Sequence, residues 1–205
     1  MSRIKDVKKQ TDNRFLNLFE LMAERRNGDV KPYFVASRVR EEKDLKAVAH
    51  NDRCDGVIMY GVHGPDKDKV VLVRQYRYPI GGYIYEFPAG LVEQGEDLMK
   101  AGVREFFEET GLTLEPRTVN SAYQKPFFTT VGMTDECCGT VYGYCDGVPT
   151  NAHQEASEDI EIVLADREEC KRILKEENVA IMCAYMLMHF IHCPGDPLAF
   201  LDEIG

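Results

Sequence analysis

The sequence lacks the paired cysteines, the basic surplus and the long apolar run that mark three large classes of protein. Its seven cysteines are an odd number without a C-x-x-C pair, so neither a disulfide framework nor a zinc site is indicated. The net charge of −10 argues against a nucleic-acid-binding surface. The longest apolar stretch, residues 179–191, is too short to cross a bilayer. Because the first residues also lack the apolar run of a signal peptide, we expect a cytoplasmic protein without nucleic-acid or membrane partners.

The most informative stretch is residues 90–112, GLVEQGEDLMKAGVREFFEETGL. Gly90 and Gly95 provide freely turning backbone before a helix. Asp97 is suited to cap the helix N-terminus, and Gly111 stands where a left-handed C-terminal cap is expected. The stretch therefore predicts a strand end, a tight loop and a helix with defined ends.

A helical periodicity places three glutamates on one face of this helix: Glu105, Glu108 and Glu109. Like charges one turn apart destabilise an isolated helix. A divalent cation relieves this repulsion, because Mg²⁺ is held by a few carboxylates together with substrate phosphates. Arg104, one turn before Glu108, can orient a carboxylate. The alternative interpretation of the pattern is a solvated acidic face without chemistry.

The residue types and their spacing in this stretch resemble the Nudix box. Gly90 is followed after five residues by Glu96, and after seven more by the run REFFEETGL, which begins at Arg104. The Nudix family hydrolyses nucleoside diphosphates linked to another moiety, using Mg²⁺ or Mn²⁺. The resemblance implies that Arg104 belongs to the catalytic residues and that the metal ligands are the Ala89 carbonyl and the carboxylates of Glu105, Glu108 and Glu109.

The rest of the chain alternates between strand-like and helix-like segments. Strands are expected at residues 55–62, 70–76, 83–88, 119–124, 140–145 and 160–164, and further helices at 166–176 and 179–192. This order predicts a mixed sheet covered by helices on both faces. It agrees with the α/β/α sandwich that the Nudix resemblance implies, with Gly102 allowing close packing of helix against sheet.

The N-terminal part predicts a small additional β-structure. Residues 1–13 are charged and expected to be loose. Residues 14–26 have helix-forming composition, but Asn27-Gly28 also suits a hairpin turn, and the following PYFVASRVR is strand-like. We favour the hairpin, because related sugar-nucleotide Nudix enzymes carry such a sheet. The expected division is an N-terminal β extension at 1–50, for dimerisation and substrate contact, and a Nudix domain at 51–205.

The motifs RQYRYP and EFPAG, upstream of the helix, resemble those of the ADP-ribose and ADP-sugar pyrophosphatases. The resemblance implies that Arg77 contacts the diphosphate, which suits the bidentate geometry of a guanidinium. It also implies that Arg38 reaches the diphosphate and that Glu86 belongs to the substrate-binding residues. Tyr33 or Phe34 would stack on adenine, where the family often has Trp, a residue that this chain lacks.

The general base is expected on a loop, as in the family. Glu155 and Glu158 lie in the acidic segment NAHQEASEDI, where the position just before the expected strand at 160–164 favours Glu158. Glu136 in TTVGMTDE is a rival. Val131 stands where ADP-ribose enzymes commonly have Pro.

The expected function is metal-dependent hydrolysis of ADP-ribose or a related nucleoside-diphosphate sugar, giving AMP or another nucleoside monophosphate and a sugar phosphate. Alternatives are a broader pyrophosphatase acting on substrates such as UDP-glucose, or a non-catalytic ligand-sensing Nudix domain. Analogy to the family also implies a homodimer.

Overall fold

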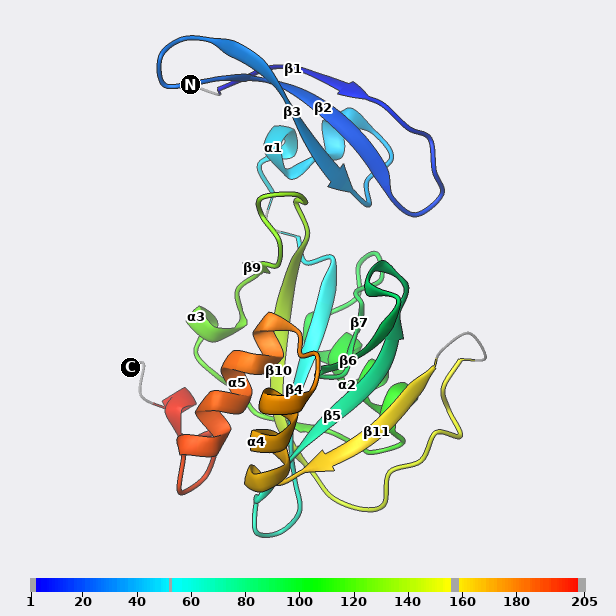
Figure 1. Cartoon of the computed structure of the whole chain (residues 1–205), viewed down its shortest axis with the longest axis vertical. Helices are drawn as coiled ribbons and strands as arrows, with labels where there is room; N and C mark the ends of the chain where they lie inside the picture. Colours follow the sequence, from blue (N-terminus) through cyan, green and yellow to red (C-terminus); the bar gives the residue numbers. More distant parts are fainter. Residues whose placement is uncertain (1–2, 52, 156–158, 203–205) are drawn as a thin grey trace. The chain divides into compact units, whose positions relative to one another are not determined.

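The computed structural model of the chain describes residues 3–51, 53–155 and 159–202. The chain divides into two compact units (Figure 1). The first unit comprises residues 1–55 and 126–138, and the second comprises residues 56–125 and 139–205. The first unit thus includes a later segment in addition to the N-terminal extension.

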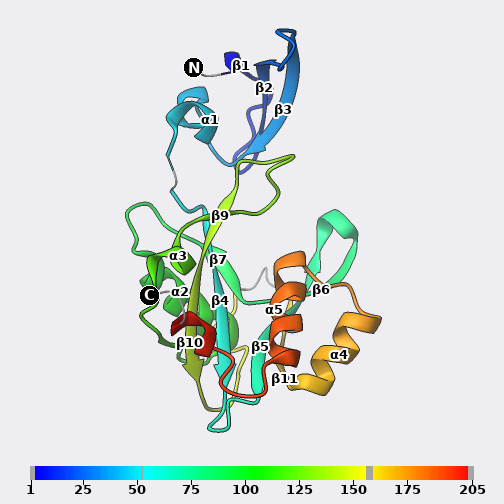
Figure 2. The same cartoon turned by 90° about the vertical axis from the view of Figure 1, so that its left-hand side faces the viewer.

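An antiparallel three-stranded sheet is the largest element of the first unit. Its strands are β1 (Ile4–Lys9), β2 (Asn17–Glu24) and β3 (Val30–Ser37), in that order (Figure 2). The short helices η1 (Glu42–Asp44) and α1 (Lys46–Ala49) follow. In the later segment, β9 (Phe127–Phe128) pairs with the first residues of β10 (Cys137–Cys145).

The predicted N-terminal hairpin is confirmed. The amide of Arg25 donates a hydrogen bond to the carbonyl of Asp29 (2.7 Å), and Gly28 between them has a φ of 87°. The expectation that residues 1–13 are loose is wrong for β1, which pairs with β2. Its few apolar side chains, Ile4 and Val7, pack against the small core of this unit, and that contact fixes the strand.

The second unit is built on the larger sheet. Its main order is β11-β5-β4-β10-β8, with β6 beside β5 and β7 beside β4. The bounds not yet given are β4 (Gly56–His63), β5 (Lys69–Arg77), β6 (Gly82–Glu86), β7 (Ala89–Leu91), β8 (Glu115–Pro116) and β11 (Ile160–Ala165).

Helices cover both faces of this sheet, as predicted for the Nudix fold. Helix α2 (Leu98–Thr110) lies on one face, and α4 (Arg167–Glu176) and α5 (Ile181–His192) lie on the other. The alternation of β4 explains the two cores, because Val57 and Met59 pack with α2 while Tyr60 and Val62 pack with α4 and α5. The single-turn elements are η2 (Tyr78–Ile80), α3 (Ser121–Gln124) and η3 (Ala199–Asp202).

The strand predicted at residues 119–124 is not formed. Asn120 accepts a hydrogen bond from the amide of Ala122 (2.9 Å) and begins the short helix α3 instead. A cap of this kind outweighs a weak strand propensity. Within the described residues, no helix is both long and apolar enough to span a membrane.

Gly102 packs closely against the sheet, as predicted. A Cβ atom at this position would lie 2.7 Å from Cγ2 of Val141 and 3.0 Å from its Cβ. Alanine gains about 0.5–1 kcal/mol of helix propensity. Overpacking costs about 1–3 kcal/mol, and a β-branched valine has little rotamer freedom to move away.

Gly102→Ala should therefore lower the free energy of unfolding by about 1–2 kcal/mol in urea denaturation. In a Val141→Ala background, which removes Cγ2 and leaves only the Cβ contact at 3.0 Å, the same change should cost less stability. A stabilising effect of Gly102→Ala in the wild-type chain would contradict this account of the packing.

Candidate active site

Capping residues set both ends of helix α2. Oδ1 of Asp97 accepts hydrogen bonds from the amides of Met99 (3.1 Å) and Lys100 (3.2 Å). Gly111 ends the helix with a φ of 69°. The predicted N-cap and C-cap are therefore confirmed, as is the positive φ of Gly95, at 83°.

Two glutamates of α2 meet strand β7. The carboxylate of Glu109 is buried, and its Oε2 accepts a hydrogen bond from the amide of Ala89 (3.1 Å). The carboxylate of Glu105 lies directly against Gly90, where a Cβ atom would overlap the carboxyl group. Gly90 lies in β7 without a positive φ, so the predicted turn at this position is wrong. The residue is glycine because Glu105 comes so close.

Arg104 joins the acidic side chains on this side of the helix. Its guanidinium donates to both oxygens of Glu96, each at 3.0 Å. It also donates to Glu105 at 2.9 Å and to Glu108 at 3.0 Å. The hydrogen bonds from Arg104 hold the pKa of Glu96 below its ordinary value. One guanidinium thus contacts three carboxylates, which reduces their mutual repulsion and fixes their directions.

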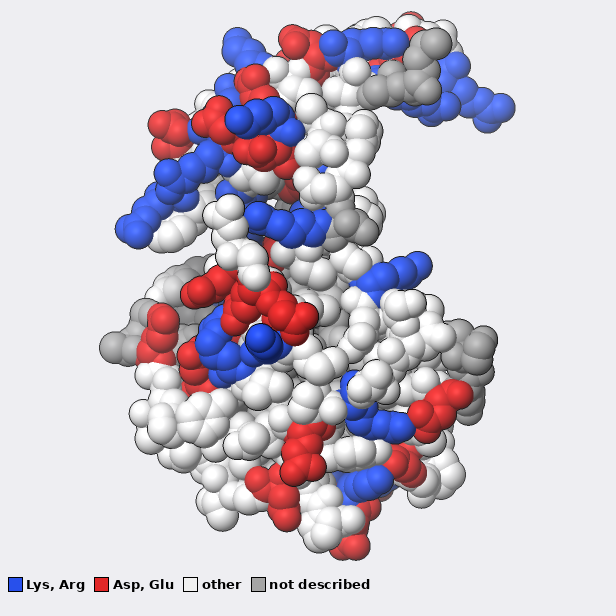
Figure 3. All heavy atoms as spheres, turned by 180° about the vertical axis from the view of Figure 1, so that it is seen from behind, with Lys and Arg blue, Asp and Glu red and all other residues white. Residues whose placement is uncertain are grey.

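The donor set fits a hard divalent cation. Glu105, Glu108 and Glu109 offer oxygen ligands only, and a single arginine leaves the cluster with an excess of negative charge. Acidic side chains surround the basic ones on the α2 side of the second unit (Figure 3). In the part of the chain that the structure describes, no three His, Cys, Asp or Glu side chains form a group that could hold a metal ion. Mg²⁺ rarely depends on protein ligands alone, because it keeps several waters and binds through a few carboxylates and substrate phosphates.

The predicted diphosphate contact in the second unit is Arg77, at the end of β5. Its Nε donates to Oε2 of Glu86 at 2.6 Å, across the β5–β6 pair. Both side chains are partly exposed. Glu86 therefore holds the guanidinium of Arg77, and the sequence did not reveal that the two residues form a pair.

The other predicted substrate residues lie in the first unit. The hydroxyl of Tyr33 donates to the carbonyl of Gly132 (2.6 Å), and Phe34 is exposed. Arg38 and Glu136 form an ion pair, with Nε to Oε1 at 3.2 Å.

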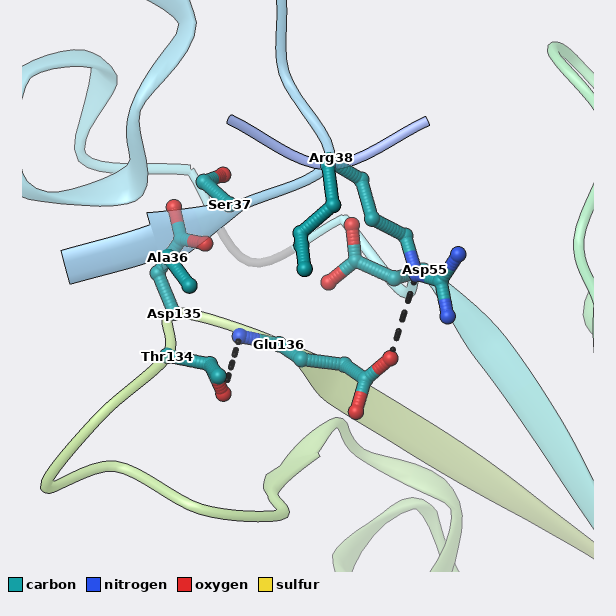
Figure 4. Close-up of a pocket in the computed structure, with 8 residues that line it drawn as sticks. Ala36, Ser37, Arg38, Asp55, Thr134, Asp135 and Glu136 are labelled. Atoms are coloured by element: carbon teal, nitrogen blue, oxygen red, sulfur yellow. Dashed lines mark hydrogen bonds and ion pairs between the residues drawn. The ribbon is translucent and has the colours of Figure 1, made fainter. Parts of the chain in front are cut away.

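Arg38 and Glu136 line a cavity of about 200 Å³ (Figure 4). Its other lining residues are Leu16, Ala36, Ser37, Asp55, Thr134 and Asp135. Asp55 also lines this cavity, and no motif in the sequence singled it out. A second hydrogen bond reaches Glu136 from Oγ1 of Thr129 (2.9 Å). Glu136, one of the candidates for the general base, thus already accepts hydrogen bonds from Arg38 and Thr129.

The remaining candidates for the base lie in the acidic loop. Glu155 is exposed, and Glu158 lies outside the described residues.

The chain is similar in sequence to a protein family and to several known proteins. The NUDIX domain family matches residues 52–179. A putative Nudix hydrolase 2 of Caenorhabditis elegans is 36% identical over 134 residues, which cover 62% of this chain and 56% of that protein. The ADP-ribose pyrophosphatase of Bacillus subtilis is 39% identical over 71 residues, 35% of this chain and 36% of that protein. The ADP-sugar pyrophosphatase of Mus musculus is 55% identical over 42 residues, 20% and 19% of the two chains.

The matches to curated relatives are partial, since the chain spans about half of the C. elegans protein and less of the other two. A solved structure described as an ADP compounds hydrolase aligns with a TM-score of 0.61 at 18% identity, covering 84% of this chain and 82% of that chain. At this identity the likeness concerns the fold. The family match covers most of the chain and includes the whole acidic helix, and the protein therefore belongs to the NUDIX domain family.

Proposed function

We propose that the protein is a Nudix hydrolase that cleaves the diphosphate of ADP-ribose or a related nucleoside-diphosphate sugar. The products are AMP, or another nucleoside monophosphate, and a sugar phosphate. The observation that carries the proposal is the cluster of Glu105, Glu108 and Glu109, held between Arg104 and strand β7. The names of relatives from B. subtilis and M. musculus support the choice of substrate class.

The carboxylates of Glu105, Glu108 and Glu109, with the carbonyl of Ala89, would hold Mg²⁺ or Mn²⁺. When bound, such an ion neutralises phosphate charge and lowers the pKa of an attacking water. Arg77 binds the diphosphate, because its fork of donors matches phosphate oxygens.

In the first unit, Arg38 binds the diphosphate and Tyr33 or Phe34 stacks on the base. A loop glutamate, Glu155, Glu158 or Glu136, accepts the proton of the water. The N-terminal extension at 1–50 contacts the substrate and forms the interface of a homodimer. The cytoplasmic location stays a prediction.

Two features favour a second candidate, a broader pyrophosphatase that accepts UDP-glucose. Val131 replaces the proline that is common in ADP-ribose enzymes, and no tryptophan is available to stack on adenine. The non-catalytic alternative is disfavoured, because every glutamate of the motif is present.

A substrate panel with Mg²⁺ tests the proposal: ADP-ribose, ADP-glucose, UDP-glucose, GDP-mannose and dinucleotides. ADP-ribose or ADP-glucose should give AMP and a sugar phosphate with the highest kcat/KM, and a chelator should stop the reaction. Equal turnover of UDP-glucose would select the broader enzyme. Absence of turnover on every member would refute the proposal.

A further inference from the structure

A loop of the second unit caps the C-terminal end of α2. The last four carbonyls of a helix have no partner within it. In this helix the carbonyl of Glu109 accepts a hydrogen bond from Nε2 of Gln154 (2.7 Å). The carbonyl of Thr110 accepts one from the amide of Thr150 (2.9 Å). Residues 150–154 therefore bind the same turn that carries the buried carboxylate of Glu109.

Two packing contacts reinforce this attachment. The ring of His153 lies over the ring of Phe107, with centroids 4.5 Å apart and planes inclined by 32°. Thr150 packs against Gly111, where a Cβ atom would lie 2.8 Å from the carbonyl oxygen of Thr150. Gly111 is thus required for two reasons: it adopts the positive φ at the helix end, and its lack of a side chain lets the loop come close.

The attached segment leads directly to a candidate base. Glu155 follows Gln154, so their Cα atoms are about 3.8 Å apart. Gln154 is in turn bonded to the main chain of Glu109. Glu136 belongs to the other unit and is bound by Arg38 and Thr129. Among the described candidates, Glu155 is therefore the one that directly follows a residue hydrogen-bonded to the acidic helix.

We propose that Gln154 is a positioning residue, which holds residues 150–155 on the end of α2 so that Glu155 accepts the proton of the attacking water. The proposal rests on the proposed hydrolysis and deepens it by choosing among the loop glutamates. Gln154 need not touch the substrate. Because a general base works only within hydrogen-bonding reach of its proton, loosening the loop lowers kcat more than it raises KM.

Gln154→Met keeps the side chain's length and removes the donor. We expect kcat to fall about tenfold, with KM and the Mg²⁺ requirement within about twofold. Hydrogen exchange should become faster in the described part of the loop, residues 147–155. Gln154→Lys, which restores a donor, should recover part of kcat. Val148→Ala is the matched control, since Val148 lies in the same loop with 86% of its surface exposed, and this variant should leave kcat and exchange unchanged.

A double-mutant cycle separates positioning from a general structural effect. Glu155→Gln alone should lower kcat by about 10²–10⁴-fold and remove the acidic limb of the pH–rate profile. Adding Gln154→Met to it should cause no further loss, because residues that act as a unit are not additive. In a Glu158→Gln background the tenfold effect should persist.

Additive losses in the Glu155→Gln background, or near-normal kcat of Glu155→Gln alone, would overturn the proposal. Wild-type protein that cleaves no member of the substrate panel would instead refute the proposed function. In that case the hydrogen-exchange comparison of Gln154→Met with Val148→Ala still tests whether Gln154 holds the loop.

Discussion

Replacing Glu109 by Gln should lower kcat by about 10²–10⁴-fold. A metal ion contributes several kcal/mol of transition-state stabilisation, and each 1.36 kcal/mol is a factor of about ten. The amide keeps the shape of the side chain, and its oxygen can still accept the hydrogen bond from the amide of Ala89. The fold should therefore persist, and the loss should fall on metal-dependent turnover. Steady-state kinetics across a Mg²⁺ titration, with circular dichroism for the fold, provide the measurement.

Glu168→Gln is the matched control for this change. Glu168 lies in the first turn of α4 on the other face of the sheet, where it contacts Lys171 and is largely exposed. Its replacement should leave kcat within about twofold, because a surface ion pair contributes at most about 1 kcal/mol. Near-normal turnover in Glu109→Gln would remove that residue from the metal site.

Gly90→Ala is expected to have the second largest effect. The added methyl group would occupy the position of the Glu105 carboxyl group, so that side chain must leave strand β7. Overpacking of this kind costs about 1–3 kcal/mol of stability. Displacing a ligand by about 1 Å should cost a further factor of about 10² in kcat. Chemical denaturation and kinetics on the same preparation measure both quantities.

Gly82→Ala provides the comparison, since Gly82 also lies in a strand of the second unit. A Cβ atom there would meet only the carbonyl oxygen of Ile80, at 3.9 Å, among the described residues. This variant should retain activity and stability. In a Glu105→Ala background, Gly90→Ala should no longer reduce stability. If Gly90→Ala keeps full activity, the close approach of Glu105 does not matter for function.

The parts of the structure that the sequence predicted well depend on local signals. Asp97 and Gly111 define the ends of α2 by contacts within a few residues. The hairpin around Gly28 likewise depends on the turn and on the alternation of β2 and β3.

The missed features depend on distant contacts. Strand β1 has little apolar content, and it forms because it pairs with β2 and packs Ile4 and Val7 against the small core. Arg38 pairs with Glu136, 98 positions away, and Gln154 reaches Glu109 across 45 positions.

At Gly90 the motif was recognised correctly, but the structural reason predicted for the glycine was wrong. Glycine before a helix suggested a turn, because freedom of φ is the commonest reason for this residue. The structure instead shows a strand residue whose missing side chain admits the carboxylate of Glu105. That reason depends on the packing of α2 against β7, and no local pattern reveals it.

The most direct test of the metal site is anomalous diffraction from crystals grown with Mn²⁺ and a non-hydrolysable ADP-ribose analogue. We predict manganese bound to carboxylate oxygens of Glu105 and Glu109, and loss of that peak in Glu109→Gln crystals. Manganese bound elsewhere, with the analogue present and these carboxylates still turned toward Arg104 and Ala89, would contradict the account.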